Sequence, residues 1–258
     1  MRPIFLLPFL FASLVGARAA VRTELVDYRQ GDATLEGYVA YDDSIQGKRP
    51  GVLIVHQWKG LGPYEKKRAE MLAKLGYLAF AVDIYGKGVR VDNAQEASVL
   101  AGKYKSDRAL LRARVTAGLE AMKKRSEVDS ARLAAIGYCF GGTTALELAR
   151  SGADVAAVVS FHGALNTPNT TDAANIKCRV LALHGADDPF VPPAEVSAFE
   201  DEMRKAKVDW QLVAYGGAVH SFTDWNAGSD NSKGAAYNEK ADRRSWEAMK
   251  TFFGEVLK

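Results

Sequence analysis

The sequence lacks most features that mark redox and metal-binding proteins. Its 258 residues include only two cysteines, Cys139 and Cys178, which excludes a disulfide framework. The two do not form a Cys-x-x-Cys redox motif, and no two of the four histidines have the close spacing of a His-x-x-x-His metal site. We therefore predict no metal ion and no other cofactor, and we expect both cysteines to be free thiols.

An excess of charge of one sign is also absent. The chain has 34 Lys and Arg against 31 Asp and Glu, a net charge of +3. Arg2 and Arg18 lie in an N-terminal segment that we expect to be removed, which leaves a mature chain with nearly balanced charge. Such a balance gives no reason to expect a nucleic acid partner.

Only the N-terminus carries an extended apolar run. Residues 4–15 are apolar, Arg2 precedes them, and Ala17-Arg18-Ala19 has the small-x-small pattern of a cleavage site. The run is shorter than the roughly 20 residues of a membrane-spanning helix, and no later run reaches its length. We predict a signal peptide over 1–20 and a mature protein outside the cytoplasm and free of the membrane. The alternative is a retained membrane anchor.

The rest of the chain alternates between strand-like and helix-like patterns. Residues 23–29 and 34–41 alternate around a turn and predict an antiparallel hairpin. Further strands are predicted at 51–55, 78–82, 132–136, 155–160, 180–183 and 209–215. Helices are predicted at 65–75, 94–103, 107–124 with Ser106 as N-cap, 143–150, 193–207 and 237–253. This order predicts one α/β domain over 21–258, with a mainly parallel sheet of about eight strands and helices on both faces.

One segment, GYCFGG at residues 137–142, has the pattern of a nucleophile elbow. It lies between a predicted strand and a predicted helix, and a Gly-x-nucleophile-x-Gly turn at such a junction presents its middle side chain above the sheet. Here that side chain is Cys139, and the helix N-terminus favours its thiolate form. The competing interpretation is a glycine-rich turn around an inert buried cysteine.

An activated nucleophile needs a base and an acid that orients the base. Elbows of this kind are followed along the chain by the acid and then by the base. Asp188, in the loop after 180–183, is the predicted acid, with Asp187 as the fallback. His220, in the loop after the last strand, is the predicted base. The other histidines are expected to be loop or pocket-wall residues: His56, His162 and His184.

Attack on a carbonyl group also needs two backbone donors for the oxyanion. We predict the N–H groups of Phe140, which follows the nucleophile, and of Trp58, in the loop after 51–55, with Gln57 as its neighbour. Aromatic side chains are expected to line an apolar pocket, although each fits an ordinary core position equally well. They are Trp58, Tyr85, Phe140, Phe222 and Trp225.

These residues resemble the dienelactone hydrolase family, cysteine enzymes of the α/β-hydrolase fold. The resemblance covers nearly all of the mature chain and rests on GYCFGG, DPFVP at 188–192, HSF at 220–222 and DIYG at 83–86. It implies a Cys139-His220-Asp188 triad that hydrolyses small-molecule carboxylic esters or lactones through an acyl-cysteine intermediate. It also implies a periplasmic or secreted protein, which we expect to be a monomer.

Three pocket positions depart from the family pattern. Where the best-studied members place a glutamate beside the thiol, this chain has Gln57, which cannot take a proton. Where they clamp a substrate carboxylate with two arginines, it has Lys87 and Asp224. Lysine keeps the charge without the two-pronged geometry, and an aspartate would repel a carboxylate. These departures leave the physiological ester open.

Three other functions remain in competition. A thioesterase or acyltransferase would keep the fold and the thiol but change the acceptor. A non-catalytic binding protein would explain the altered clamp. A thiol redox protein is disfavoured by the wide spacing of the cysteines, although peroxide sensing at Cys139 is compatible with the sequence.

Overall fold

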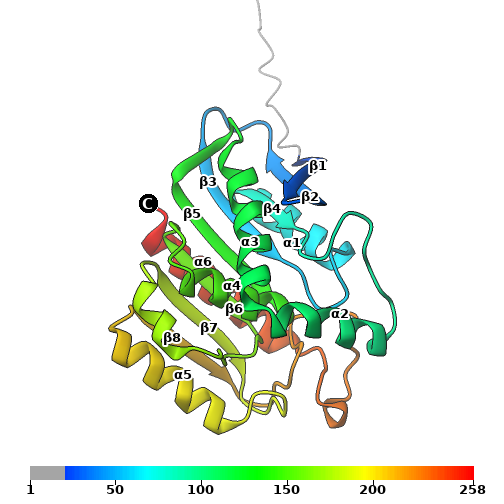
Figure 1. Cartoon of the computed structure of the whole chain (residues 1–258), viewed down its shortest axis with the longest axis vertical. Helices are drawn as coiled ribbons and strands as arrows, with labels where there is room; N and C mark the ends of the chain where they lie inside the picture. Colours follow the sequence, from blue (N-terminus) through cyan, green and yellow to red (C-terminus); the bar gives the residue numbers. More distant parts are fainter. Residues whose placement is uncertain (1–20) are drawn as a thin grey trace, which may run out of the picture.

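The computed structural model describes residues 21–258, so the predicted signal peptide lies outside the described residues. One eight-stranded sheet, in the order β1-β2-β4-β3-β5-β6-β7-β8, runs through the molecule (Figure 1). The β1–β2 and β2–β4 pairs are antiparallel, and the other five pairs are parallel. The predicted mainly parallel sheet with an N-terminal hairpin is therefore confirmed.

The strands are β1 (Val21–Gln30), β2 (Ala33–Asp42), β3 (Arg49–Val55), β4 (Leu78–Val82), β5 (Val128–Tyr138), β6 (Ala157–Phe161), β7 (Arg179–Gly185) and β8 (Trp210–Tyr215). The α-helices are α1 (Pro63–Ala73), α2 (Ala94–Ser106), α3 (Arg108–Lys123), α4 (Phe140–Arg150), α5 (Pro193–Ala206) and α6 (Glu239–Val256). Two short 3-10 helices are η1 (Thr170–Asn175) and η2 (Asn231–Lys233).

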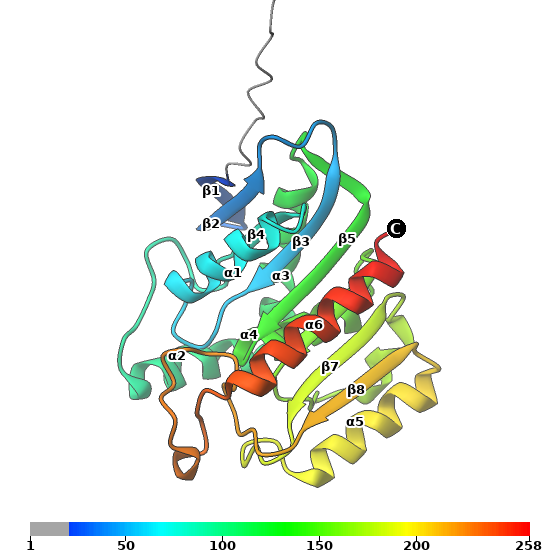
Figure 2. The same cartoon turned by 180° about the vertical axis from the view of Figure 1, so that it is seen from behind.

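Helices cover both faces of the sheet, as predicted. Helices α3 and α4 lie in front of it in Figure 1, whereas α1 and α6 lie in front in the reverse view of Figure 2. Each face has its own apolar core, one containing side chains of α2 to α5 and the other containing side chains of α1 and α6. The central strands are apolar along their length because both of their faces are buried.

Four helix starts differ from the prediction. Helix α1 begins at Pro63 rather than at 65, and α4 begins at Phe140 rather than at 143. Helix α3 is capped by Asp107 rather than Ser106, because the Asp107 carboxylate accepts a hydrogen bond from Leu110 N at 2.9 Å. Helix α6 begins at Glu239, not at position 237, since Asn238 caps it by accepting from Ala241 N at 3.1 Å. Side-chain oxygens at such positions satisfy amides that have no partner within the helix.

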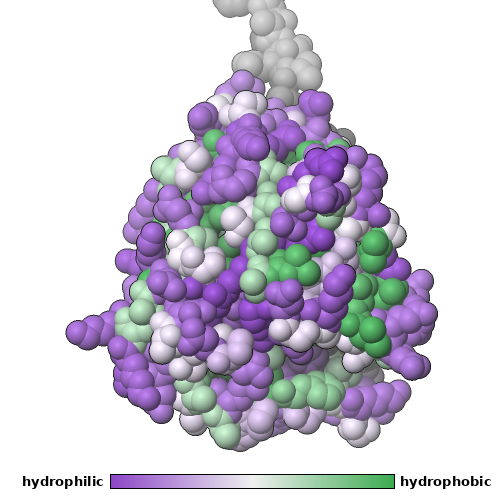
Figure 3. Space-filling model, viewed as in Figure 1, coloured by the Kyte–Doolittle hydropathy of each residue, from purple (hydrophilic) through white to green (hydrophobic). Residues whose placement is uncertain are grey.

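The surface is mostly hydrophilic, with scattered apolar patches (Figure 3). One patch lies on the right edge of this view, over the region where Figure 1 draws α2 and the loop before it. Val89 in that loop and Val99 on α2 are among the exposed large hydrophobic residues.

Within residues 21–258, none of the helices is both long enough and apolar enough to cross a membrane.

The junction between β5 and α4 is packed too tightly for side chains. A Cβ on Gly137 would lie 1.9 Å from the Gly141 carbonyl oxygen, and one on Gly141 would lie 2.1 Å from the Val55 carbonyl oxygen. Both contacts are with backbone atoms, which cannot rotate away. The two glycines therefore allow α4 to start directly against the carboxyl ends of β3 and β5.

We expect Gly137→Ala to lower the free energy of unfolding by about 1–3 kcal/mol or more, because the methyl group must displace the α4 backbone. Gly102→Ala is the matched control. A Cβ there meets nothing within 4 Å on α2, so that change should add about 0.5–1 kcal/mol. Urea denaturation of both variants measures the difference. A Gly137→Ala protein as stable as the parent would contradict the tight junction.

Candidate active site

The candidate nucleophile occupies a strained turn between β5 and α4. Cys139 has φ 54° and ψ −116°, a conformation that costs a non-glycine residue on the order of 1–3 kcal/mol. Its N–H donates to Phe161 O at 3.0 Å, and its carbonyl oxygen accepts from Gly142 N at 3.0 Å. These bonds hold the turn so that the thiol projects above the carboxyl end of the sheet.

The structure brings together the three residues that the sequence singled out. His220 Nε2 lies 3.0 Å from Cys139 Sγ, and His220 Nδ1 lies 2.8 Å from Asp188 Oδ2. The Asp188 side chain is fully buried, and that of His220 is 13% exposed. Thiol, imidazole and carboxylate thus form a continuous hydrogen-bonded chain.

The two adjacent aspartates have different partners. Asp188 accepts from Phe190 N at 2.9 Å through Oδ1, which leaves Oδ2 for His220. Asp187 is exposed, and its carboxylate accepts from Gly217 N at 3.0 Å. Asp188 is therefore the carboxylate that orients the imidazole. Asp187 instead binds the backbone of the loop that leads to His220.

The electrostatics of the chain favour a thiolate–imidazolium pair. Burial opposes ionisation of Cys139, but the positive charge of His220, its hydrogen bond and that of Phe140 N–H together lower the pKa of the thiol. Burial also opposes protonation of His220, yet the Cys139 thiolate and the Asp188 hydrogen bond raise the His220 pKa to about 10. Each partner stabilises the charged form of the other.

The loop after β3 presents backbone N–H groups that have no acceptor among the described residues, and Trp58 N–H is one of them. Gln57 N donates to Glu65 Oε1 at 3.0 Å, Gln57 O lies 2.5 Å from His56 Nδ1, and Trp58 O accepts from Tyr85 OH at 2.9 Å. Of these loop groups, the Trp58 N–H has no acceptor among the described residues. In a planar trans peptide, the C=O and N–H groups point in opposite directions. Because Gln57 O faces His56, the Trp58 N–H of the same peptide points away from His56.

The second predicted donor is at the start of α4. Phe140 is the first residue of that helix, so its N–H has no partner within the helix, and it hydrogen-bonds the Cys139 sulfur. The positive end of the helix dipole reinforces this donor. The geometry therefore offers N–H groups from both loops predicted for an oxyanion site.

The polar pocket residues are already paired. Gln57 Nε2 donates to Asp224 Oδ2 at 3.0 Å, so two of the three residues that depart from the family pattern contact each other. Lys87 Nζ lies 2.6 Å from Asp27 and 3.3 Å from Glu36, both on the β1–β2 hairpin. The structure thus directs the Lys87 ammonium to that hairpin rather than to the thiol.

The predicted aromatic residues divide between core and surface. Phe222 is fully buried against His162, with ring centroids 5.1 Å apart, and Tyr85 is 5% exposed. Trp225 is 39% exposed and remains available to a ligand. Sequence reasoning did not assign Phe190 to the pocket, although it is 58% exposed and its ring meets His220 edge-on at 5.4 Å. Its position in the loop beside Asp188 was the available signal.

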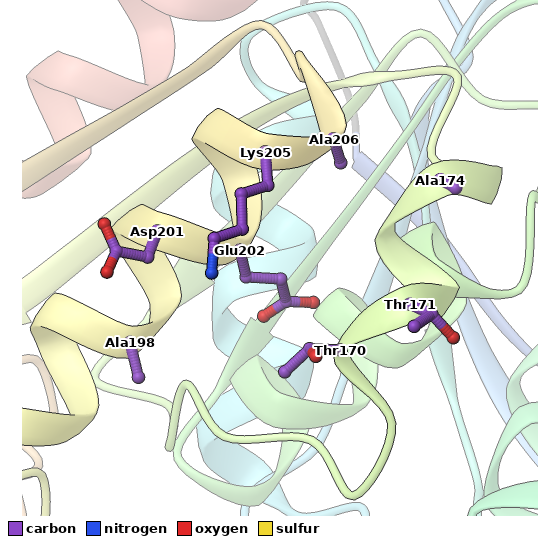
Figure 4. Close-up of a pocket in the computed structure, with 8 residues that line it drawn as sticks. All are labelled: Thr170, Thr171, Ala174, Ala198, Asp201, Glu202, Lys205 and Ala206. Carbon is purple, nitrogen blue, oxygen red and sulfur yellow. The ribbon is translucent and has the colours of Figure 1, made fainter.

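A separate surface hollow of about 470 Å³ lies between η1 and α5. Figure 4 shows Glu202 extending from α5 toward Thr170 in this hollow. The Glu202 carboxylate is already held by Arg150 at 2.7 Å, so it is not free to bind a ligand. Across residues 21–258, no group of three or more His, Cys, Asp or Glu side chains is placed to hold a metal ion.

The sheet order, the turn after β5 and the two later loops that carry Asp188 and His220 define an α/β-hydrolase fold. The model of the Dienelactone hydrolase family matches residues 35–257, which is most of the chain. This protein therefore belongs to the dienelactone hydrolase family, a family of hydrolases, as its motifs predicted.

Several relatives align over almost the whole chain. The crystal structure of a dienelactone hydrolase-like promiscuous phosphotriesterase from metagenomic libraries is 44% identical, with a TM-score of 0.89, and the match covers 93% of this chain and 100% of that one. The structure of m3DLH is 42% identical, with the same coverage and TM-score. A Synechocystis protein named "Putative carboxymethylenebutenolidase" is 27% identical over 92% of this chain and 98% of its own length.

We expect the rate at which Cys139 reacts with iodoacetamide to reach its plateau at a lower pH than that of an ordinary thiol, and the ion pair to persist up to about pH 10. The lowered thiol pKa and the raised His220 pKa keep the ion pair within that window. An ordinary thiol would still be gaining thiolate around pH 8.5. Cys178 should stay silent, because burial raises its pKa to about 12.

Alkylation rates between pH 5 and 10, with Cys139→Ser as the control for reaction at Cys178, measure this profile. A midpoint near that of a free cysteine would contradict the ion pair.

Proposed function

We propose that this protein hydrolyses carboxylic esters or lactones of small molecules through an acyl-cysteine intermediate. The observation that carries the proposal is the hydrogen-bonded chain from Cys139 Sγ through His220 to Asp188, with spacings of 3.0 and 2.8 Å. A thiolate beside an imidazolium and next to a helix N-terminus is a nucleophile suited to acyl transfer.

The first half of the reaction forms a thioester. The Cys139 thiolate attacks the carbonyl carbon, and the negative charge that moves to the oxygen is stabilised by the N–H groups of Phe140 and Trp58. When the carbon–oxygen bond of the ester breaks, His220 Nε2 gives its proton to the departing alkoxide, which leaves as the alcohol. In a lactone, that alcohol stays attached to the acyl group.

The second half releases the acid. Neutral His220 takes a proton from water as the water attacks the thioester carbon, and the carbon–sulfur bond then breaks to regenerate the thiolate. His220 ends as imidazolium, so the resting ion pair is restored. Asp188 holds Nδ1–H throughout and stabilises each imidazolium state.

A second candidate substrate class is a neutral phosphotriester. The relative that is 44% identical is described as a promiscuous phosphotriesterase. In this chain the two positions of the cationic clamp carry Lys87, which pairs with the β1–β2 hairpin, and Asp224, which pairs with the uncharged Gln57. An uncharged ester of a carboxylic or a phosphoric acid avoids repulsion by the Asp224 carboxylate.

We also propose, from residues 1–20 alone, that the protein works after export.

Cys139→Ala is expected to reduce kcat/KM for a chromogenic aryl ester by about 10⁴-fold or more, because no other group can form the thioester. Rapid mixing should give a burst of phenol with the native protein. Intact mass should show an acyl adduct on Cys139 alone.

A neutral aryl phosphotriester assayed in parallel tests the second substrate class by the same two readouts. Thiol acceptors added during turnover distinguish hydrolysis from acyl transfer. Equal turnover by native protein and Cys139→Ala would refute the mechanism, and silence in both would favour a non-catalytic binding protein.

Asp188→Asn is expected to lower kcat by roughly 10²–10⁴-fold, since an amide can neither stabilise imidazolium nor fix the same tautomer. Asp187→Asn is the matched control. Its carboxylate binds only backbone at Gly217, so we expect turnover within about threefold of the native rate. Steady-state kinetics of the pair decide the assignment. Larger loss at Asp187 would move the acid role to that residue.

A further inference from the structure

A second histidine lies directly behind the nucleophile. His162 follows β6, is 1% exposed, and has φ 40°, a strained value for a non-glycine residue. Its Nδ1 lies 3.1 Å from Cys139 N, and its Nε2 lies 2.7 Å from Thr223 Oγ1. Thr223 is three residues after His220. The His162 ring therefore joins the backbone of the nucleophile to the loop that carries the base.

The proton positions along this contact follow from Arg68, which can only donate. Arg68 Nε donates to Tyr64 OH at 3.1 Å, and Tyr64 OH donates to Thr223 O at 3.2 Å. Tyr64 OH and Thr223 Oγ1 are 2.6 Å apart, and either oxygen can donate here; in the arrangement in which the Tyr64 proton goes to Thr223 O, Thr223 is the donor. Thr223 Oγ1 is then left to accept from His162 Nε2–H.

The other ring nitrogen is set by the backbone. Cys139 N–H is shared between Phe161 O at 3.0 Å and His162 Nδ1 at 3.1 Å, so the Nδ1 that faces this donor presents its lone pair. Both contacts require the same species, neutral imidazole with its proton on Nε2. Burial and the positive charges of His220 and Arg68 lower the His162 pKa well below its ordinary value, which agrees with a neutral ring.

Arg68 is itself held permanently in place. Its Nη2 donates to Thr223 O at 2.9 Å and pairs with Asp242 on α6 at 2.5 Å. It is 1% exposed, and four aromatic rings surround its guanidinium within 5.5 Å: Tyr64, Tyr138, Trp225 and Trp246. A buried guanidinium stays charged across the working pH range, so Arg68 is always the donor to Tyr64 OH and to Thr223 O.

We propose that His162 is a positioning residue for the Cys139–His220 pair, held as the Nε2–H tautomer by the Arg68–Tyr64–Thr223 relay. This inference rests on the proposed function, because it concerns the readiness of the same thiol. In this tautomer, His162 accepts the Cys139 amide and helps to hold the strained turn. It also adds no positive charge beside His220, whose ring centroid is 5.3 Å away.

The opposite tautomer is also neutral, so it would disturb only the contact with the Cys139 amide. With a proton on Nδ1, the ring would direct an N–H at the Cys139 N–H, and the thiol would lose its alignment with His220. The other groups that act on the thiol charge are His220, Lys105 on α2 and Tyr85 after β4. None of these contacts the hydroxyl of Thr223, so that hydroxyl can be removed without changing them directly.

Thr223→Val tests the relay, because it removes the hydroxyl and keeps the shape. We expect the pH midpoint of Cys139 alkylation to rise by about one unit. At pH values below the native midpoint, the alkylation rate should then be about tenfold lower than in the native protein. Thr223→Ser keeps the hydroxyl and should retain the native midpoint. Thr144→Val removes a fully buried hydroxyl from α4, and we expect it to change stability without moving the midpoint.

The imidazole ¹⁵N signals of His162 give the direct readout. We expect the neutral Nε2–H tautomer in the native protein and in Thr223→Ser, and a mixture with Nδ1–H in Thr223→Val. A native Nδ1–H tautomer, or a Thr223→Val midpoint equal to the native one, would overturn the proposal. Thiol alkylation needs no ester turnover, so these results test the positioning role of His162 by itself. Failure of the hydrolase mechanism is detected separately, by the ester assay of Cys139→Ala.

Discussion

The 3.0 Å contact between the Cys139 thiol and the His220 imidazole is the interaction on which the rest of the site depends. It joins residues 81 positions apart and lowers the thiol pKa while raising that of the imidazole. A thiolate and an imidazolium stabilise each other only while their distance and orientation are maintained. Much of the surrounding structure maintains this distance and this orientation.

Close backbone packing and buried ion pairs hold the nucleophile in place. Gly137 and Gly141 let α4 start against the sheet, and the strained backbone of Cys139 persists because its neighbours leave no room to relax. Deeper in the protein, Arg150 at the end of α4 pairs with Glu147 on the same helix and Glu202 on α5. Breaking a buried pair of this kind typically costs about 3–5 kcal/mol. Helix α4, whose first amide faces the thiol sulfur, is thus rigidly fixed.

The base is held by a different set of contacts. Asp188 orients His220 from the loop after β7, and the segment after η2 holds its backbone, because His220 N donates to Gly234 O and Ala236 N donates to His220 O. The polar stretch from 226 to 233 leads into this support. The substrate side is more open: Phe190 and Trp225 are exposed, Gln57 pairs with Asp224, and Lys87 pairs with the β1–β2 hairpin.

The sequence by itself determined the order of strands and helices, the elbow and the family. Those features are local: apolar periodicity, glycine spacing and the chain order of Cys139, Asp188 and His220 are all visible along the chain. Helix starts such as Asp107 were missed because neighbouring residues compete to cap a helix.

Only the tertiary structure decided which side chains meet. No sequence pattern connects Arg68 and Tyr64 on α1 with Thr223, which is 155 to 159 residues away, or His162 with the amide of Cys139. Nor could the sequence show that Lys87 binds the β1–β2 hairpin instead of the pocket. Hydrogen bonds and ion pairs depend on distances of a few ångströms and on direction, and the packing of the sheet and helices sets both.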